Sequence, residues 1–128
     1  MSKPCLLIVD DEPDMIEFVI DVAEDMGFSC VSADSAKECL TLFKSIHPAG
    51  IVLDVVMPDM DGIELVNELA KLNCTAPIIA MSGYQKMYLE LLETLAGEQN
   101  AVVLGTLSKP FQAKELQNLL GQVLDSLD

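Results

Sequence analysis

The stretch IVLDVVMPDMDG, residues 51–62, joins a short apolar run to a polar turn and then to a helical pattern. Short apolar runs without clean alternation, bounded by turn residues, are typical of strands buried on both faces. Asp54 therefore stands where such a strand ends. Asp61 is a favourable N-cap for a helix that begins at Gly62. The stretch predicts a strand, a loop and a helix, with a carboxylate at the carboxyl end of the strand.

Similar apolar runs recur along the chain, and amphipathic segments of helical length lie between them. The predicted strands cover 5–9, 30–33, 50–54, 77–81 and 101–105. The predicted helices cover 13–26, 36–46, 62–72, 84–96 and 112–127. Pro13 suits a first helical turn, Ser35 suits an N-cap, and Gly27 suits a helix end. Because strands alternating with helices require parallel pairing and right-handed crossovers, we expect an α/β three-layer (βα)5 sandwich with a parallel five-stranded sheet.

The composition limits the possible functions. A chain of 128 residues fits one compact domain, 1–128. Seven Lys and Arg against 21 Asp and Glu give a net charge of −14, which repels nucleic acid and anionic membranes. The N-terminal apolar run is too short for a signal peptide or a membrane span. The four cysteines form no Cys-x-x-Cys pair, so neither a zinc site nor disulfides are indicated. We expect a cytoplasmic domain with reduced thiols.

Acidic side chains follow two of the predicted strands. Asp10 and Asp11 come directly after the first strand, and Asp54 ends the third. In open parallel sheets, binding sites form at the carboxyl ends of strands, beside the point where the strand order reverses. If these strands are neighbours, their carboxylates repel one another unless a cation lies between them. Carboxylate oxygens suit Mg²⁺, so the pattern predicts a site for Mg²⁺ or Mn²⁺.

The other strand ends supply groups that suit phosphoryl transfer. Aspartate can carry a phosphoryl group as an acyl phosphate, and transfer needs charge neutralisation and positioning. Ser82 ends the fourth strand and can donate to a phosphoryl oxygen, while Lys109 follows the fifth and provides a positive charge. Pro110 fixes the backbone after Lys109, and a cis peptide there would aim the lysine inward. We interpret Asp54 as a nucleophile as well as a metal ligand.

At these residues the sequence resembles the receiver domain of two-component response regulators, of the chemotaxis-regulator type, over nearly all of its length. The resemblance rests on VDDE at 9–12, DVVMPDMDG at 54–62, MSG at 81–83 and KPF at 109–111. It implies a flavodoxin-like sheet in the order 2-1-3-4-5. It also implies that Asp54 accepts phosphate from a partner histidine kinase, a phosphotransfer protein or a small acyl phosphate. The implied site residues are Asp10, Asp11, Asp54 and the Val56 backbone carbonyl for the metal, with Ser82 and Lys109 as the hydroxyl and basic residues.

The chain departs from the receiver pattern at the position three residues before the lysine, which is often aromatic and here is Thr106. The switch candidates are therefore Ser82, Tyr84 and Thr106, and Tyr88 is a further substitute for the aromatic residue. The resemblance implies that phosphorylation shifts a conformational equilibrium and so controls a downstream protein or an output domain. A phosphorylation-dependent homodimer through the fourth helix, fifth strand and fifth helix is also implied.

Other functions remain open from the residues. Haloacid-dehalogenase-like phosphatases also use an aspartyl phosphate with Mg²⁺, but they place the nucleophile after the first strand in a D-x-D pattern, where this chain has VDDEPD. A flavodoxin-like flavin binder needs a Ser-, Thr- and Gly-rich loop at that position. A phosphorylation-independent scaffold of the same fold is a third alternative. We expect no independent enzyme activity beyond the phosphorylation and dephosphorylation of the domain itself.

Overall fold

Strands and helices alternate along the whole of the structure, a computed structural model that describes residues 3–83 and 86–127. The elements are β1 (Cys5–Val9), α1 (Pro13–Asp25), β2 (Ser29–Ala33), α2 (Ala36–Ile46), β3 (Gly50–Asp54), α3 (Gly62–Lys71), β4 (Ile78–Ser82), α4 (Lys86–Glu98), β5 (Val103–Ser108) and α5 (Ala113–Asp125). The strands pair in parallel in the order β2-β1-β3-β4-β5. The predicted fold class and strand order are confirmed.

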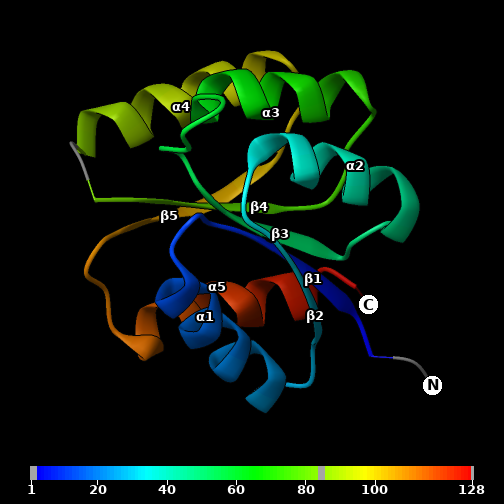
Figure 1. Ribbon diagram of the computed structural model, residues 1–128, viewed down its shortest axis with the longest axis vertical. Helices are drawn as coiled ribbons and strands as arrows, with labels where there is room; N and C mark the ends of the chain where they lie inside the picture. Colours follow the sequence, from blue (N-terminus) through cyan, green and yellow to red (C-terminus); the bar gives the residue numbers. More distant parts are fainter. Residues whose placement is uncertain (1–2, 84–85, 128) are drawn as a thin grey trace.

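Helices cover both faces of the sheet, with α1 and α5 on one face and α2, α3 and α4 on the other (Figure 1). Side chains of a strand point alternately to the two faces, so each central strand contributes to both layers. In β3, Ile51 and Leu53 pack with the layer of α2, α3 and α4, whereas Val52 packs with α1 and α5. All three side chains are fully buried. This two-sided burial explains why the central strands are continuous apolar runs.

The helix ends follow the local signals in the sequence. The side chain of Ser35 accepts a hydrogen bond from the Glu38 amide at 3.1 Å, and that of Asp61 accepts one from the Glu64 amide at 2.8 Å. Pro13 opens α1, and Gly27 follows its end with a φ of 103°. The predicted caps are therefore confirmed. Among the helices in the described residues, none is long and apolar enough to cross a membrane.

The last strand lies further along the chain than the sequence predicts. The apolar run suggested 101–105, but β5 spans Val103–Ser108. Ala101 instead completes the end of α4, because its amide donates to the Ala96 carbonyl at 3.0 Å, and Asn100 before it has a φ of 64°. β5 is an edge strand and is only partly buried, so it accommodates polar residues that a central strand would exclude.

Candidate functional site

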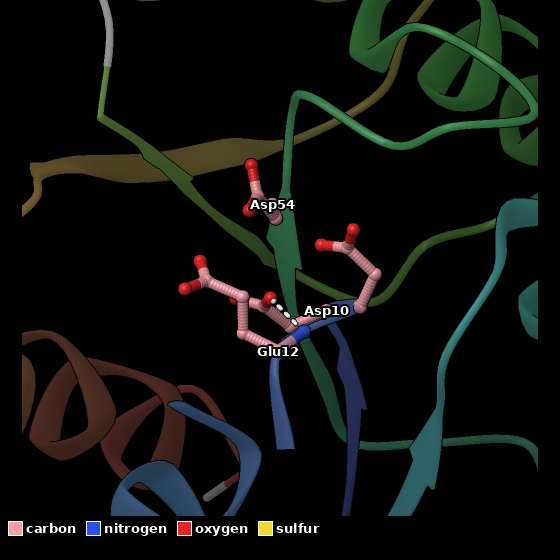
Figure 2. Close-up of side chains that lie close together, drawn as sticks. Asp10, Glu12 and Asp54 are labelled. Carbon is pink, nitrogen blue, oxygen red and sulfur yellow. Dashed lines mark hydrogen bonds between the residues drawn. The ribbon is translucent and has the colours of Figure 1, made fainter. Parts of the chain in front are cut away.

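Four acidic residues meet at the carboxyl edge of the sheet. β1 and β3 are neighbours, and Val9 lies opposite Leu53, so the next residues, Asp10 and Asp54, come side by side. The loop after β1 adds Asp11 and Glu12. One carboxylate oxygen from each of the four lies within 4.8 Å of the others. Figure 2 shows Asp10, Glu12 and Asp54 at this edge, where the Glu12 amide donates to Asp10 Oδ1 at 2.9 Å.

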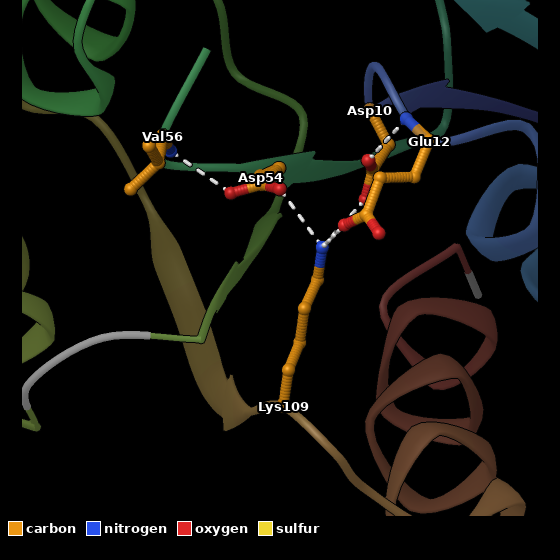
Figure 3. Close-up of polar contacts among 5 residues, drawn as sticks. All are labelled: Asp10, Glu12, Asp54, Val56 and Lys109. Atoms are coloured by element: carbon orange, nitrogen blue, oxygen red, sulfur yellow. Dashed lines mark hydrogen bonds and ion pairs between the residues drawn. The ribbon is translucent and has the colours of Figure 1, made fainter.

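Lys109 extends from the loop after β5 into this cluster (Figure 3). Its Nζ donates to Asp10 Oδ2 at 2.9 Å and to Asp54 Oδ2 at 2.8 Å. A third ion pair, of 3.2 Å, joins Nζ to Glu12 Oε1. The Lys109 amide donates to the Ser82 carbonyl at 2.8 Å, and the peptide bond to Pro110 is cis. The hydrogen bond to Ser82 places the backbone of Lys109 at the carboxyl edge of the sheet, next to the end of β4.

Burial governs the electrostatics of the cluster. Asp10 is fully buried, and this burial raises the pKa of its carboxyl above the ordinary value, although the Lys109 hydrogen bond acts in the opposite direction. Burial also disfavours the charge of Lys109, but hydrogen bonds to Asp54 and Asp10 outweigh it and raise the lysine pKa. Lys109 is therefore cationic at neutral pH. It offsets the repulsion that Asp10 and Asp54 would otherwise exert on each other.

A pocket of about 250 Å³ opens above Asp54 and is lined by Asp11, Glu12, Asp54, Val56, Gly83 and Lys109. A water molecule takes up about 30 Å³ in the liquid, so the pocket has room for a hydrated ion and a phosphoryl group. Its anionic oxygens are the donors that Mg²⁺ prefers. The residues therefore fit a divalent cation bound next to Asp54.

The structure brings most of the predicted site residues together. Asp10, Asp11, Asp54 and Lys109 form the cluster described above, and Val56 lines the pocket while its amide donates to Asp54 Oδ1 at 2.9 Å.

The remaining candidates lie on the neighbouring strands or beyond the described part of the chain. Ser82 is buried at the end of β4, next to the pocket residue Gly83. Thr106 lies within β5, opposite Ala80. Tyr84 lies outside the described residues, as does the Tyr88 side chain.

Glu12 is a site residue that the sequence did not single out. It follows two stronger metal-ligand candidates, and an acidic residue in a loop is usually solvated. Its side chain is 65% exposed, yet it contacts the lysine that binds Asp10 and Asp54. Its place in VDDE, adjacent to Asp11, is the signal that could have indicated it.

The strand order and the acidic pocket define the class of the protein: a doubly wound α/β domain with a cluster of acidic side chains that could hold a cation where the strand order reverses. The model of the response regulator receiver domain family matches residues 6–121. The chain belongs to this family, whose members act in two-component systems.

Individual relatives agree with this assignment. The chemotaxis protein CheY of Thermotoga maritima is 31% identical over 121 residues, which cover 92% of this chain and 95% of that protein. A receiver domain protein from Methanospirillum hungatei has a solved structure that matches with a TM-score of 0.86 at 25% identity, over 98% of this chain and 96% of that one. CheY4 of Vibrio cholerae matches with a TM-score of 0.83 at 24% identity, over 95% and 99% of the two chains, and shows the shared fold.

Several curated relatives are much longer than this chain. The probable transcriptional regulator ycf27 of Porphyridium aerugineum is 30% identical over 128 residues, which is all of this chain and 51% of that protein. The regulatory protein AtoC of Escherichia coli is 29% identical over 119 residues, which cover 93% of this chain and 25% of that protein. The chain thus spans about half of one relative and a quarter of the other.

Proposed function

We propose that residues 1–128 are one receiver domain of a two-component phosphorelay, in which Asp54 accepts a phosphoryl group from a histidine kinase, a phosphotransfer protein or a small acyl phosphate. The observation that carries this proposal is the contact of Lys109 Nζ with Asp54 Oδ2 at 2.8 Å inside a pocket of acidic groups. Receiver domains bind Mg²⁺ at an acidic pocket, and the cluster of Asp10, Asp11, Glu12 and Asp54 supplies suitable oxygens.

The proposed reaction is an in-line displacement on phosphorus. A carboxylate oxygen of Asp54 attacks the phosphorus atom, the bond to the donor's nitrogen or oxygen breaks, and an acyl phosphate forms. The attacking group is a carboxylate rather than a hydroxyl, so the step depends on charge neutralisation and positioning more than on a general base. Mg²⁺ or Mn²⁺, held by Asp10, Asp11, Asp54 and the Val56 carbonyl, would neutralise the phosphoryl oxygens. Lys109 transfers its contact from Asp54 to the new phosphoryl group, and the Ser82 hydroxyl donates to another oxygen.

The proposed conformational change follows from the added negative charge on Asp54 at the carboxyl edge of the sheet. An acyl phosphate attracts the Ser82 hydroxyl and the Lys109 ammonium group. Ser82 ends β4, and Lys109 directly follows β5. The proposed switch candidates are Ser82, Tyr84 and Thr106, and Thr106 occupies the β5 position that is often aromatic in receivers. This shift favours one of two existing conformations, which a downstream protein or an output domain recognises.

The proposed output surface includes α4, β5 and α5, and it also serves for a phosphorylation-dependent homodimer. Leu91 on α4 and Val102 before β5 are each 48% exposed, which supports a contact surface there. The domain acts in the cytoplasm, without direct contact with nucleic acid or membrane, and catalyses only its own phosphorylation and dephosphorylation.

The test is to incubate the purified protein with Mg²⁺ and acetyl phosphate and to record its intact mass. We expect the gain of one phosphate, lost with EDTA and in Asp54→Asn. If no gain occurs although Mg²⁺ binds, phosphoramidate provides a phosphorus–nitrogen donor, as a phosphohistidine does. Failure with both small donors and with a kinase would favour the scaffold alternative, and turnover of a phosphomonoester would favour the phosphatase.

A further inference from the structure

Asp59, in the loop between β3 and α3, holds the start of a different helix. The first amides of any α-helix have no partner within the helix. In α2, the Ala36 amide donates to Asp59 Oδ1 and the Lys37 amide donates to Asp59 Oδ2, each at 3.1 Å. The two donors lie 23 and 22 residues before Asp59 in the chain. Asp59 therefore forms a tertiary cap that joins two separate parts of the fold.

Ser35, the local N-cap of α2, binds different amides of the helix from those that Asp59 binds. Ser35 accepts from the Glu38 amide through its side chain at 3.1 Å and from the Cys39 amide through its carbonyl at 3.0 Å. Ser35 thus serves the third and fourth amides of the helix, whereas Asp59 serves the first and second. The two residues cap the same helix end, but only Asp59 connects it to the loop that follows Asp54.

Two hydrogen bonds from backbone amides and the packing of Met57 hold the loop of residues 55–61. The Gly62 amide donates to the Val55 carbonyl at 2.7 Å, and the Val56 amide donates to Asp54 Oδ1 at 2.9 Å. Met57 is only 7% exposed and packs into the core beneath α2, α3 and α4. The outer half of the loop contacts α2 through the Asp59 carboxylate.

We propose that Asp59 is a positioning residue that holds loop 55–61 against α2, so that the backbone of Val56 keeps the geometry needed to bind Mg²⁺ beside Asp54. This inference rests on the proposed function of the acidic pocket. Two hydrogen bonds to one carboxylate fix its position and orientation. A negative charge is also favourable at the positive end of the helix dipole, and the Ala36 amide is the main cause of the lowered pKa of Asp59.

The test compares Asp59→Ala with Ser35→Ala, because both variants remove capping interactions from α2 and only the first releases the loop. Titration calorimetry with MgCl₂ gives the metal affinity, and amide hydrogen exchange without metal gives the protection of residues 55–61. We expect Asp59→Ala to weaken Mg²⁺ binding by about tenfold, as the loss of a residue that orients a ligand does. We also expect faster exchange in the loop. Ser35→Ala should change neither quantity, although it lowers the Tm.

Asp59→Asn keeps one acceptor oxygen and should recover part of both properties; it replaces Asp59→Ala if that variant does not fold. A wild-type Mg²⁺ affinity and unchanged loop exchange in Asp59→Ala, with a Tm lowered as in Ser35→Ala, would overturn the inference and leave Asp59 as a helix cap alone. If the wild-type protein itself binds no Mg²⁺, the proposed function fails as well, and this outcome is distinct because it appears before any substitution.

Discussion

Lys109 is the residue that allows Asp10 and Asp54 to lie side by side. The exposed fractions of the three side chains are 13%, 0% and 7%, so water screens their charges poorly. One ammonium group contacts both carboxylates at 2.9 and 2.8 Å. Removing the cation leaves unpaired acids, whereas removing an acid relieves repulsion. The two kinds of substitution should therefore change stability in opposite directions.

Lys109→Ala should lower the free energy of unfolding of the metal-free protein by about 3 kcal/mol, as expected when one partner of a buried ion pair is lost. Mg²⁺ should restore more stability to this variant than to the wild type, because the ion replaces the missing charge. Thermal denaturation with and without MgCl₂ measures both effects. The control is Lys71→Ala. Lys71 forms an exposed 3.2 Å ion pair with Glu68, and the loss of this pair should lower the free energy of unfolding by less than about 1 kcal/mol. Equal losses in the two variants would contradict the role of Lys109.

Asp10→Asn should make the metal-free protein more stable at neutral pH. Burial raises the pKa of Asp10, so the Asp10 carboxyl group binds its proton more tightly in the folded state than in the unfolded state. The resulting stabilisation is present below the unfolded pKa, 3.8, and is lost as the pH rises through the raised pKa of the folded state. The stability advantage of the variant should therefore grow with pH. Urea denaturation over about pH 4.5 to 7.5 measures it, and a difference independent of pH would show that the Asp10 charge has no such cost.

At the scale of elements, the sequence was most informative where local rules and burial agree. The stretch 51–62 became β3, the loop and α3, with Asp61 as the cap, because buried strands and N-caps have strong local signals. β5 begins and ends later in the chain than the apolar run predicts, because an edge strand does not need a continuous apolar run. The strand order came from the resemblance to receivers, since periodicity cannot choose between neighbours. The contacts of Glu12 and Asp59 depend on tertiary proximity. The position of Glu12 beside Asp11 is a weak local signal for its contact, and no local pattern indicates the contact of Asp59 with α2.

Gly62 is required at the junction of the loop and α3. A Cβ at this position would lie 2.5 Å from Val55 Cβ and 2.7 Å from Val55 Cα, so the backbone would have to move. Gly62→Ala should therefore destabilise the protein by about 1–3 kcal/mol, as overpacking does. Gly121→Ala in α5 is the matched control: a Cβ there meets nothing within 4 Å, and the change should stabilise by about 0.5–1 kcal/mol. Chemical denaturation compares the two, and a neutral Gly62→Ala would refute the close contact.

The thiols of β2 and α2 should react slowly in the folded protein. Burial raises the pKa of Cys30 to about 11 and that of Cys39 to about 12, so both thiols are protonated near neutral pH. Their contribution to stability is present below the ordinary pKa of 9.0 and is lost as the pH rises from there toward the folded values. Iodoacetamide labelling followed by mass spectrometry should modify Cys39 only after denaturation. Rapid labelling of Cys39 in the folded state would contradict its burial.

At the scale of the whole molecule, the site adjoins β4 and β5, the strands at the end of the sheet where the proposed output surface lies. Asp54 ends β3, and the order continues through β4, with Ser82, to β5, which leads to Lys109. A phosphoryl group adds roughly −1.5 to −2 charges near neutral pH, to a chain whose net charge is already −14. Among the side chains that the structure describes, Lys109 is the cation that contacts Asp54, at 2.8 Å. We therefore propose that phosphorylation of Asp54 acts first on β4 and β5, the strands next to α4 and α5.

The position of the phosphoryl group tests the central claim most directly. After incubation with Mg²⁺ and acetyl phosphate, borohydride reduces an aspartyl phosphate to homoserine, which tandem mass spectrometry can locate in the sequence. We predict homoserine at Asp54 and at no other aspartate, and none when EDTA replaces Mg²⁺. Homoserine at Asp10 or Asp11, or a phosphorylated protein with Asp54 unmodified, would contradict the assignment of Asp54 as the phosphoacceptor.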